Sequence, residues 1–206
     1  MIAIVDYGVG NLFSLQSSLK AFGLAAEVTG DAQKILAAQK VILPGVGAFE
    51  DAMQKLRENN LDEVVRTAAK SGVPLLGICL GMQLLFEESQ EFGLHKGLGL
   101  VPGQVTSLEK DLREGGFAYK VPHMGWNPIH LVRPQSPLFK YTAEGDSMYY
   151  VHSFYATGCK PSTIATSEYG IAVTGAVQHG NVFGTQFHPE KSGKAGLAML
   201  KAFAEV

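Results

Sequence analysis

The stretch PLLGICLGMQLLF, residues 74–86, decides the fold of this chain. The apolar run over residues 73–76 predicts a buried strand, and residues 82–86 predict the start of a helix. Between them, residues 77–81 have the G-x-C-x-G pattern of a nucleophile elbow, in which a strand reverses sharply into a helix. A side chain on Gly77 or Gly81 would collide with that strand or helix. The pattern therefore predicts a reactive thiol at Cys79, at a helix N-terminus that favours a thiolate.

The alternative for Cys79 is a purely structural role. A free cysteine is often a small buried apolar residue, with no part in chemistry. Here a glycine flanks Cys79 at two residues on each side, and the surrounding pattern changes from strand to helix. This combination favours a catalytic cysteine over a structural one.

Composition and length point to an ordinary globular protein. The chain has 206 residues, 46% of them hydrophobic and 17% charged, with a formal net charge of −2. This balance gives no electrostatic reason to expect nucleic acid or an anionic membrane as a partner. The two cysteines make no disulfide framework, and residues 1–6 resemble a strand and not a signal peptide. We expect a single cytoplasmic domain over residues 1–206, without a membrane span.

Hydrophobic periodicity predicts an α/β fold with a mostly parallel central sheet. The expected strands of this part cover residues 2–5, 25–28, 40–43 and 73–76. The expected helices cover residues 12–22, 32–38, 49–70 (in two pieces, broken near Asn59-Asn60) and 193–203. Gly8-Val9-Gly10 lacks the further residues of a dinucleotide or phosphate loop, so nucleotide binding is not expected there.

The second half of the chain has a different sequence pattern, which predicts an added antiparallel β layer in the same domain. Short β-like segments separated by glycine and proline cover residues 104–108, 117–121, 127–132, 148–151, 164–167, 172–178 and 182–186. Before them, the acidic residues 87–91 are expected to be a solvated helix end. Residues 122–127, which include the only tryptophan, Trp126, are either an ordinary packed turn or an aromatic anchor at an interface.

Six histidines are available as a base for the thiol. His188 stands out because it follows a predicted strand and precedes Pro189 and Glu190. In an extended segment, residues two apart project to the same side, so Glu190 can orient the His188 ring while the ring faces Cys79. His123 and His152 remain weaker candidates. The sequence thus predicts a Cys79–His188–Glu190 triad.

A glycine-rich segment also follows the predicted strand at residues 40–43. Pro44-Gly45-Val46-Gly47 is either a plain loop or a segment whose backbone N–H groups point into a site, as in an oxyanion hole. Its place next to an elbow on a neighbouring strand favours the second interpretation.

These residues resemble the class I (triad) glutamine amidotransferases. The segments GICLGMQ at residues 77–83 and HPE at residues 188–190 are similar to the nucleophile and distal motifs of that family. The resemblance implies a flavodoxin-like, three-layer α/β fold and hydrolysis of glutamine to glutamate and ammonia, with no cofactor and no metal. It implies an oxyanion hole formed by the backbone N–H groups of Val46 and Leu80. The positions that match glutamine-binding residues of the family are Gly47, Gln83, Glu91, Ser153 and Phe154.

Within the family, five segments are similar to the glutaminase subunits of imidazole glycerol phosphate synthases: residues 6–12, 44–47, 122–127, 151–154 and 188–193. This resemblance implies a heterodimer with a (β/α)₈-barrel cyclase subunit, which uses the ammonia in histidine biosynthesis. The residues expected at that interface are Asn11, Trp126, Asn127, Tyr149 and Lys191. Two alternatives remain open: a glutaminase serving another ammonia-using synthase, and a non-catalytic subunit that only binds a partner.

Overall fold

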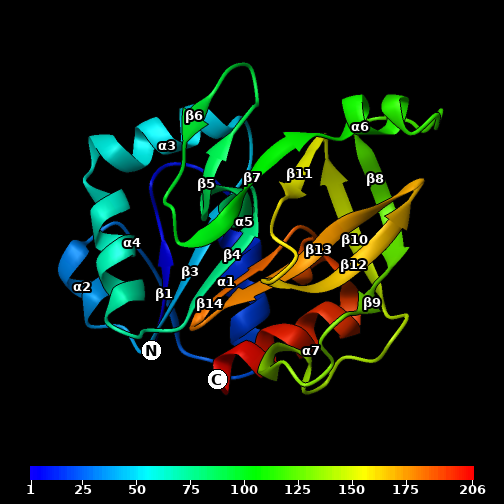
Figure 1. Ribbon diagram of the computed structural model, residues 1–206. Helices are drawn as coiled ribbons and strands as arrows, with labels where there is room; N and C mark the ends of the chain where they lie inside the picture. The colour runs from blue at the N-terminus through cyan, green and yellow to red at the C-terminus, as the bar shows by residue number, and fades with distance from the viewer.

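An eight-stranded sheet runs through the centre of the computed structural model, which describes residues 1–206 (Figure 1). Its strand order is β2-β1-β3-β4-β14-β13-β12-β9. The first five strands in this order are parallel, and the last three continue the sheet in antiparallel pairing. The strands are β1 (Ile2–Val5), β2 (Ala26–Thr29), β3 (Lys40–Gly45), β4 (Leu75–Cys79), β9 (His130–Leu131), β12 (Thr163–Tyr169), β13 (Ile171–His179) and β14 (Val182–Thr185).

Helices cover both faces of this sheet, as the uninterrupted apolar runs of its strands require. In β1, Ala3 and Val5 pack towards one set of helices, whereas Ile2 and Ile4 pack towards the other set. The first set consists of α2 (Ala32–Leu36), α3 (Phe49–Glu58) and α4 (Leu61–Lys70), and the second of α1 (Leu12–Ala21) and α7 (Gly193–Ala204). This confirms the predicted α/β class with a mostly parallel sheet.

The remaining strands form two smaller sheets, so the antiparallel part is more divided than expected. One is the pair β10 (Ser147–His152) and β8 (His123–Pro128). The other has the order β11-β7-β5-β6, with β11 (Phe154–Thr157), β7 (Val101–Ser107), β5 (Phe86–Ser89) and β6 (His95–Lys96). The chain also contains a short helix, α6 (Leu108–Glu114), and two 3₁₀ turns, η1 (Pro137–Phe139) and η2 (Pro189–Lys191).

Two local predictions were wrong, and one open alternative is excluded. The helix after the elbow, α5 (Leu80–Leu84), ends early, and residues 86–89 form strand β5 because they pair with β7. Residues 117–121 form no strand; the Phe117 and Tyr119 rings instead meet edge to face. Residues 123–127 belong to strand β8 and are not a turn, because β10 supplies a hydrogen-bonded partner for them.

The elbow itself has the predicted geometry. Cys79 ends β4 and directly precedes α5, with a φ of 54° that L-residues rarely adopt. A Cβ atom at Gly77 would lie 2.6 Å from the Gly81 carbonyl oxygen, and one at Gly81 would lie 1.9 Å from the Leu43 carbonyl oxygen. Both glycines are therefore needed because the backbone of α5 lies directly against strands β3 and β4.

We expect Gly81→Ala to destabilise the fold strongly. The new methyl group meets the backbone of a buried strand, which cannot move aside without breaking the central sheet. The free energy of unfolding should fall by at least about 2 kcal/mol, measured by urea denaturation. Gly116→Ala is the control, since Gly116 has a φ of 78° but open space around it, and it should cost only about 1 kcal/mol. Equal losses in the two variants would contradict the close approach at the elbow.

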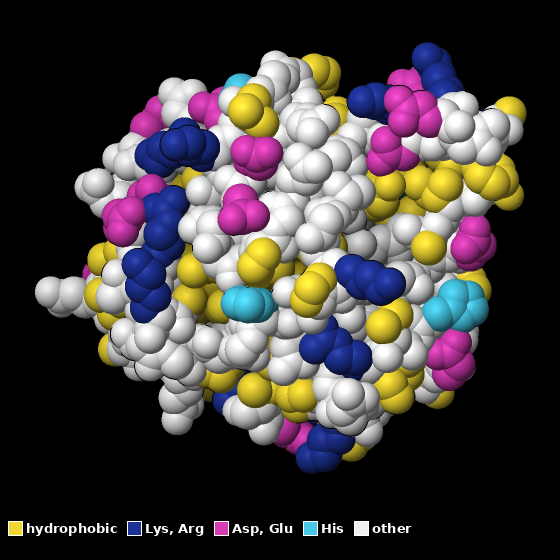
Figure 2. Space-filling model, in the orientation of Figure 1, with side chains coloured by type: hydrophobic (Ala, Val, Ile, Leu, Met, Phe, Trp, Pro, Cys, Tyr) yellow, Lys and Arg dark blue, Asp and Glu magenta, His cyan; other side chains and the backbone are white.

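The surface is mixed in character. In Figure 2, charged side chains gather over α3 and α4, and hydrophobic side chains gather below α6. The hydrophobic region includes a groove of about 650 Å³ lined by Phe92, Phe117, Tyr119 and Phe154 among others. No helix is both long enough and apolar enough to cross a lipid bilayer.

Candidate active site

A cavity of about 330 Å³ lies at the carboxyl ends of β3 and β4, the usual position for a ligand in an α/β sheet. Most of its lining comes from residues that the sequence predicted for the site. They come from the glycine-rich segment, the elbow and helix α5, the loop after β5, the junction of β10 and β11, and the loop after β14: Val46, Gly47, Cys79, Leu80, Gln83, Glu91, Ser153, Phe154 and His188. Pro122, Val151 and His152 complete the lining.

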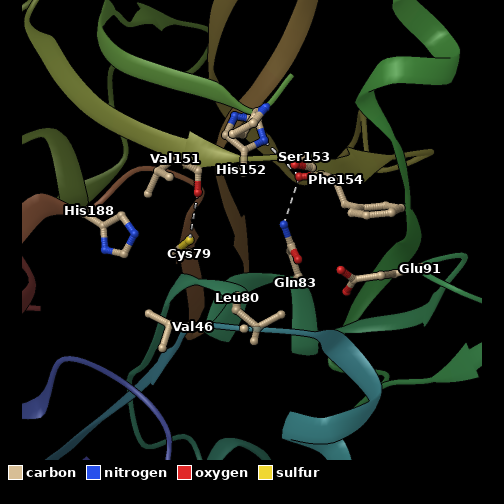
Figure 3. Close-up of a pocket in the computed structure, with 12 residues that line it drawn as sticks. Val46, Cys79, Leu80, Gln83, Glu91, Val151, His152, Ser153, Phe154 and His188 are labelled. Atoms are coloured by element: carbon tan, nitrogen blue, oxygen red, sulfur yellow. Dashed lines mark hydrogen bonds between the residues drawn. The ribbon is translucent and has the colours of Figure 1, made fainter. Parts of the chain in front are cut away.

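Cys79 and His188 face each other across one end of this cavity (Figure 3). The Nδ1 atom of His188 lies 2.8 Å from Oε1 of Glu190, and both side chains are almost fully buried. The opposite edge of the ring is turned towards the Cys79 sulfur (Figure 3). Thiol, imidazole and carboxylate therefore stand in the order that a nucleophile, its proton carrier and an orienting group require.

The local backbone around His188 differs from the expectation. Residues 189–191 form one turn of 3₁₀ helix, and only His188 itself is extended. The Ser192 hydroxyl fixes the segment by donating to the His188 carbonyl oxygen and accepting from the Tyr149 N–H. The turn still brings Glu190 back to the ring, so the pairing was predicted correctly although its geometric reason was not.

The pKa of His188 is raised to about 9 by its surroundings. Burial lowers the pKa, but hydrogen bonds and charge attraction from Cys79 and Glu190 outweigh it. At neutral pH the ring therefore carries a proton, and it lies between Cys79 and Glu190. An imidazolium in this position can give its proton to a leaving group.

The glycine-rich segment after β3 is held firmly at its start and loosely at its end. The Tyr7 hydroxyl donates to the Pro44 carbonyl oxygen at 2.7 Å, and a Cβ atom at Gly45 would lie 2.7 Å from the Gly81 nitrogen. From Val46 onward the contacts are fewer: the Val46 side chain is exposed, and Gly47 has a φ of 94° with open space around it. The peptide that carries the Val46 N–H thus lies where a fixed segment meets a free one.

The far end of the cavity offers oxygen atoms to a ligand. Oε2 of Glu91 accepts the Phe49 N–H at the start of α3 at 2.7 Å, and Oε1 remains for a ligand. Burial raises the pKa of Glu91, partly offset by this N–H. The Gln83 Nε2 group donates to the Phe154 carbonyl oxygen at 3.0 Å and to Gln186 at 3.1 Å. Both N–H bonds are then used, so the amide oxygen of Gln83 is the atom left for a ligand. Glu91 is thus part of the cavity and not of a solvated helix end.

Comparison with known proteins identifies the family. The family described as Glutamine amidotransferase class-I matches residues 3–206. An imidazole glycerol phosphate synthase subunit HisH from Syntrophotalea carbinolica is 47% identical over the full length of both chains. The HisH subunit from Geobacter metallireducens is 48% identical, over 98% of this chain and 97% of its own. The chain belongs to the HisH group of class I glutamine amidotransferases.

Solved structures of low sequence identity share the fold. A structure described as PurLQS from Thermotoga maritima has a TM-score of 0.76 and 19% identity, over 99% of this chain and 97% of the other. A structure described as a glutamine amidotransferase has a TM-score of 0.75 and 18% identity, over the full length of both chains. These confirm the class I amidotransferase fold.

Two supporting residues of this amidotransferase site were not predicted from the sequence. Gln186 is fully buried, and its amide lies 4.0 Å from the Cys79 sulfur, while the sulfur lies 3.9 Å from the Val151 carbonyl oxygen. Gln186 directly follows β14, and it reaches the site because β14 pairs with β4, a pairing that the local sequence does not show. Val151 comes from the small β10–β8 sheet, whose position depends on tertiary packing alone.

The two weaker histidine candidates are not the base. His123 and His152 are buried and contact each other, with 2.9 Å between Nδ1 of His123 and Nε2 of His152. The other nitrogen of His152 faces the Phe154 carbonyl oxygen at 2.9 Å. Burial lowers the pKa of His123 to about 4 and that of His152 to about 3. Neither ring has a nitrogen or a charge free for Cys79.

These two pKa values predict that acid destabilises the fold. Both histidines have folded-state pKa values below the unfolded value of about 6.5, so they stabilise the fold above pH 6.5 and lose this contribution as pH falls towards 4. Together the two histidines should lower the free energy of unfolding by about 4 kcal/mol between pH 7 and pH 5, about 2 kcal/mol each, measured by urea denaturation. His123→Asn should flatten this dependence, whereas His130→Asn, at an exposed ring, should not. The same slope in both variants would contradict the assignment.

Four of the five predicted interface residues lie on neighbouring surface beside the triad. The Trp126 side chain is exposed, and its ring is 6.0 Å from that of Tyr149 on the paired strand. A Cβ atom at Gly193 would lie 3.9 Å from the Trp126 ring, which places exposed Lys191 close by. Asn11 is exposed and, with Glu190 and His188, lines a small chamber behind the triad. The Asn127 amide instead points inward, to His123 and the Glu168 carbonyl oxygen.

Proposed function

We propose that this chain hydrolyses glutamine with Cys79 as nucleophile and passes the ammonia to a (β/α)₈-barrel cyclase subunit. The observation that carries the proposal is the placement of Cys79 and the protonated His188 at one end of a cavity, with the Glu91 carboxylate at the other. A cavity of about 330 Å³ is of the size that small-molecule ligands occupy.

Glutamine would lie along this cavity with its side-chain amide at Cys79 and its amino acid end at Glu91. The Glu91 carboxylate and the Gln83 amide oxygen are acceptors suited to the substrate ammonium group. Gly47, Ser153 and Phe154 would form the walls around the bound substrate.

The reaction would proceed in two steps. The Cys79 thiolate attacks the amide carbon, and the C–N bond breaks as His188 gives its proton to the departing ammonia. Water then attacks the glutamyl thioester, with neutral His188 accepting a proton, and glutamate and the thiolate are released. The N–H groups of Val46 and Leu80 would stabilise the oxyanion formed in each step.

The partner part of the proposal rests on the HisH relatives, which are named as subunits of imidazole glycerol phosphate synthase. The exposed surface around Trp126, Tyr149 and Lys191 lies beside the catalytic end of the cavity, so a partner covering it would receive ammonia with a short path. Aromatic side chains of this kind often anchor interfaces. Cytoplasmic location is part of the proposal, because both cysteines are free thiols.

The test combines this chain with a cyclase subunit and a ribonucleotide substrate of the cyclase. With glutamine as the nitrogen source, the pair should form imidazole glycerol phosphate and glutamate in equal amounts. The cyclase alone should form product only with added ammonium salt. Glutamate release without product formation would contradict ammonia transfer, and no glutamate release by the pair would contradict the glutaminase activity.

A further inference from the structure

A chain of hydrogen bonds runs from strand β8 through the paired strand β10 to the wall of the proposed glutamine cavity. Nδ2 of Asn127 lies 3.2 Å from Nε2 of His123, and Nδ1 of His123 lies 2.9 Å from Nε2 of His152. Nδ1 of His152 in turn lies 2.9 Å from the carbonyl oxygen of Phe154. The chain of hydrogen bonds starts at Asn127, one residue before the exposed end of the β8 strand, and ends at a residue that lines the cavity.

In this chain of hydrogen bonds, the choice of donor and acceptor at each link is fixed from both ends. The Glu168 carbonyl oxygen can only accept, and it lies 2.9 Å from Nδ2 of Asn127, so the NH₂ group of Asn127 is the one that faces His123. Nε2 of His123 must then be the acceptor. At the other end the Phe154 carbonyl oxygen can also only accept, so Nδ1 of His152 must donate.

Only one pair of histidine tautomers satisfies both ends. His152 carries its proton on Nδ1, so its Nε2 accepts, and His123 must donate to it from Nδ1. Both rings are neutral, as burial of each predicts from its lowered pKa. The His123 ring is also clamped between Tyr150 and Tyr169, with ring centroids 4.7 Å and 4.0 Å away. Each hydrogen bond between Asn127 and Phe154 therefore has one direction, and the His123 ring has little freedom to rotate.

The last acceptor of the chain also holds a predicted glutamine-binding residue. The Phe154 carbonyl oxygen accepts from Nε2 of Gln83 at 3.0 Å as well as from His152. Its position thus determines where the Gln83 amide stands in the cavity, and which of its atoms faces the substrate. We propose that Asn127 and His123 act through His152 and Phe154 as positioning residues for glutamine binding. This inference rests on the proposed glutaminase function.

The first test is spectroscopic and needs no activity. In a long-range ¹H–¹⁵N NMR spectrum of the histidine rings, His123 and His152 should both show the neutral Nδ1–H tautomer between pH 8 and pH 5. In Asn127→Leu, His123 should keep the Nδ1–H tautomer, because Nε2 of His152 still accepts from it, but the ¹⁵N chemical shift of its Nε2 atom should change because that atom has lost its donor. An Nε2–H tautomer for either ring of the unaltered protein, or titration of either ring with a pKa near 6.5, would overturn the proposal.

The second test is kinetic, in the complex with saturating cyclase and its ligand. Asn127→Leu should raise the KM for glutamine roughly three- to tenfold, the fold-change that losing one hydrogen bond corresponds to, with kcat changed less than twofold. Asn181→Leu is the matched control: its amide also donates to two carbonyl oxygens, at 2.9 and 2.8 Å, but far from the cavity. It should leave both constants unchanged.

The outcomes separate this inference from the proposed function. Suppose that the unaltered complex is active. The positioning role alone is then overturned if the KM for glutamine does not change in Asn127→Leu, or if it rises equally in Asn181→Leu. An inactive unaltered complex overturns the glutaminase proposal, and the positioning role falls with it. If Asn127→Leu fails to fold, the tautomers of the unaltered protein still decide whether the chain of hydrogen bonds exists.

Discussion

Replacing Cys79 with alanine is expected to lower glutamate release by at least about 10⁴-fold, because no other group in the cavity can form the glutamyl thioester. The fold should survive the change. The Cys79 side chain is small, and its nearest polar contacts are long, at 3.9 and 4.0 Å from the sulfur. The rate of glutamate formation in the complex with ligand-bound cyclase is the measurement.

Cys159→Ala is the matched control for this variant. Cys159 is also a buried free thiol, but its sulfur contacts the hydroxyl groups of Thr163 and Thr174, at 3.6 and 3.7 Å. Its loss should cost stability and leave the rate of glutamate formation within about twofold. Substantial activity in Cys79→Ala, or an equal loss in Cys159→Ala, would show that the elbow thiol is not the nucleophile.

Glutamate release by the isolated chain is expected to be on the order of 10²–10³-fold slower than in the complex with ligand-bound cyclase, the usual effect of losing one oxyanion donor. The structure gives a reason for this dependence. The glycine-rich segment is held by Tyr7 and by the elbow as far as Gly45, but Val46 and Gly47 have few contacts. The Val46 N–H can therefore point away from the oxyanion until a partner fixes the peptide.

The comparison needs three samples: the isolated chain, the complex without cyclase ligand, and the complex with it. Only the third should reach the full rate of glutamate formation at saturating glutamine. Equal rates in the three samples would mean that the Val46 N–H is already in place without a partner. A slow isolated chain that recovers with cyclase alone would assign the effect to docking and not to the ligand.

The parts of the fold that the sequence predicted are those determined by neighbouring residues. Apolar runs such as residues 2–5 indicate strands buried on both faces, and the glycines at positions 77 and 81 indicate the elbow, because the constraint acts within one short segment. Residues 87–89 show the opposite case. Glutamate favours a helix, but pairing with β7 makes this segment a strand, and that partner is not visible in the local pattern.

The residues of the candidate site also fall into two groups, those that local motifs predicted and those that depend on tertiary packing. Cys79, His188 and Glu190 stand in short motifs whose residue types indicate their chemistry. Tyr7 and Gln186 support the site from the segments that follow β1 and β14, so their roles depend on which strands become neighbours. Residues 122–127 contain proline and glycine, which are typical of turns, yet their pairing with β10 makes most of them a strand.

Trapping the covalent intermediate tests the central claim most directly. The complex with ligand-bound cyclase is mixed with isotopically labelled glutamine, stopped with acid within one turnover, digested and examined by mass spectrometry. A labelled glutamyl group is expected on the peptide that contains Cys79, and it should be absent when His188 is replaced by alanine. Glutamate formation at the full rate with no label on Cys79, or with the label on Cys159, would contradict the central claim.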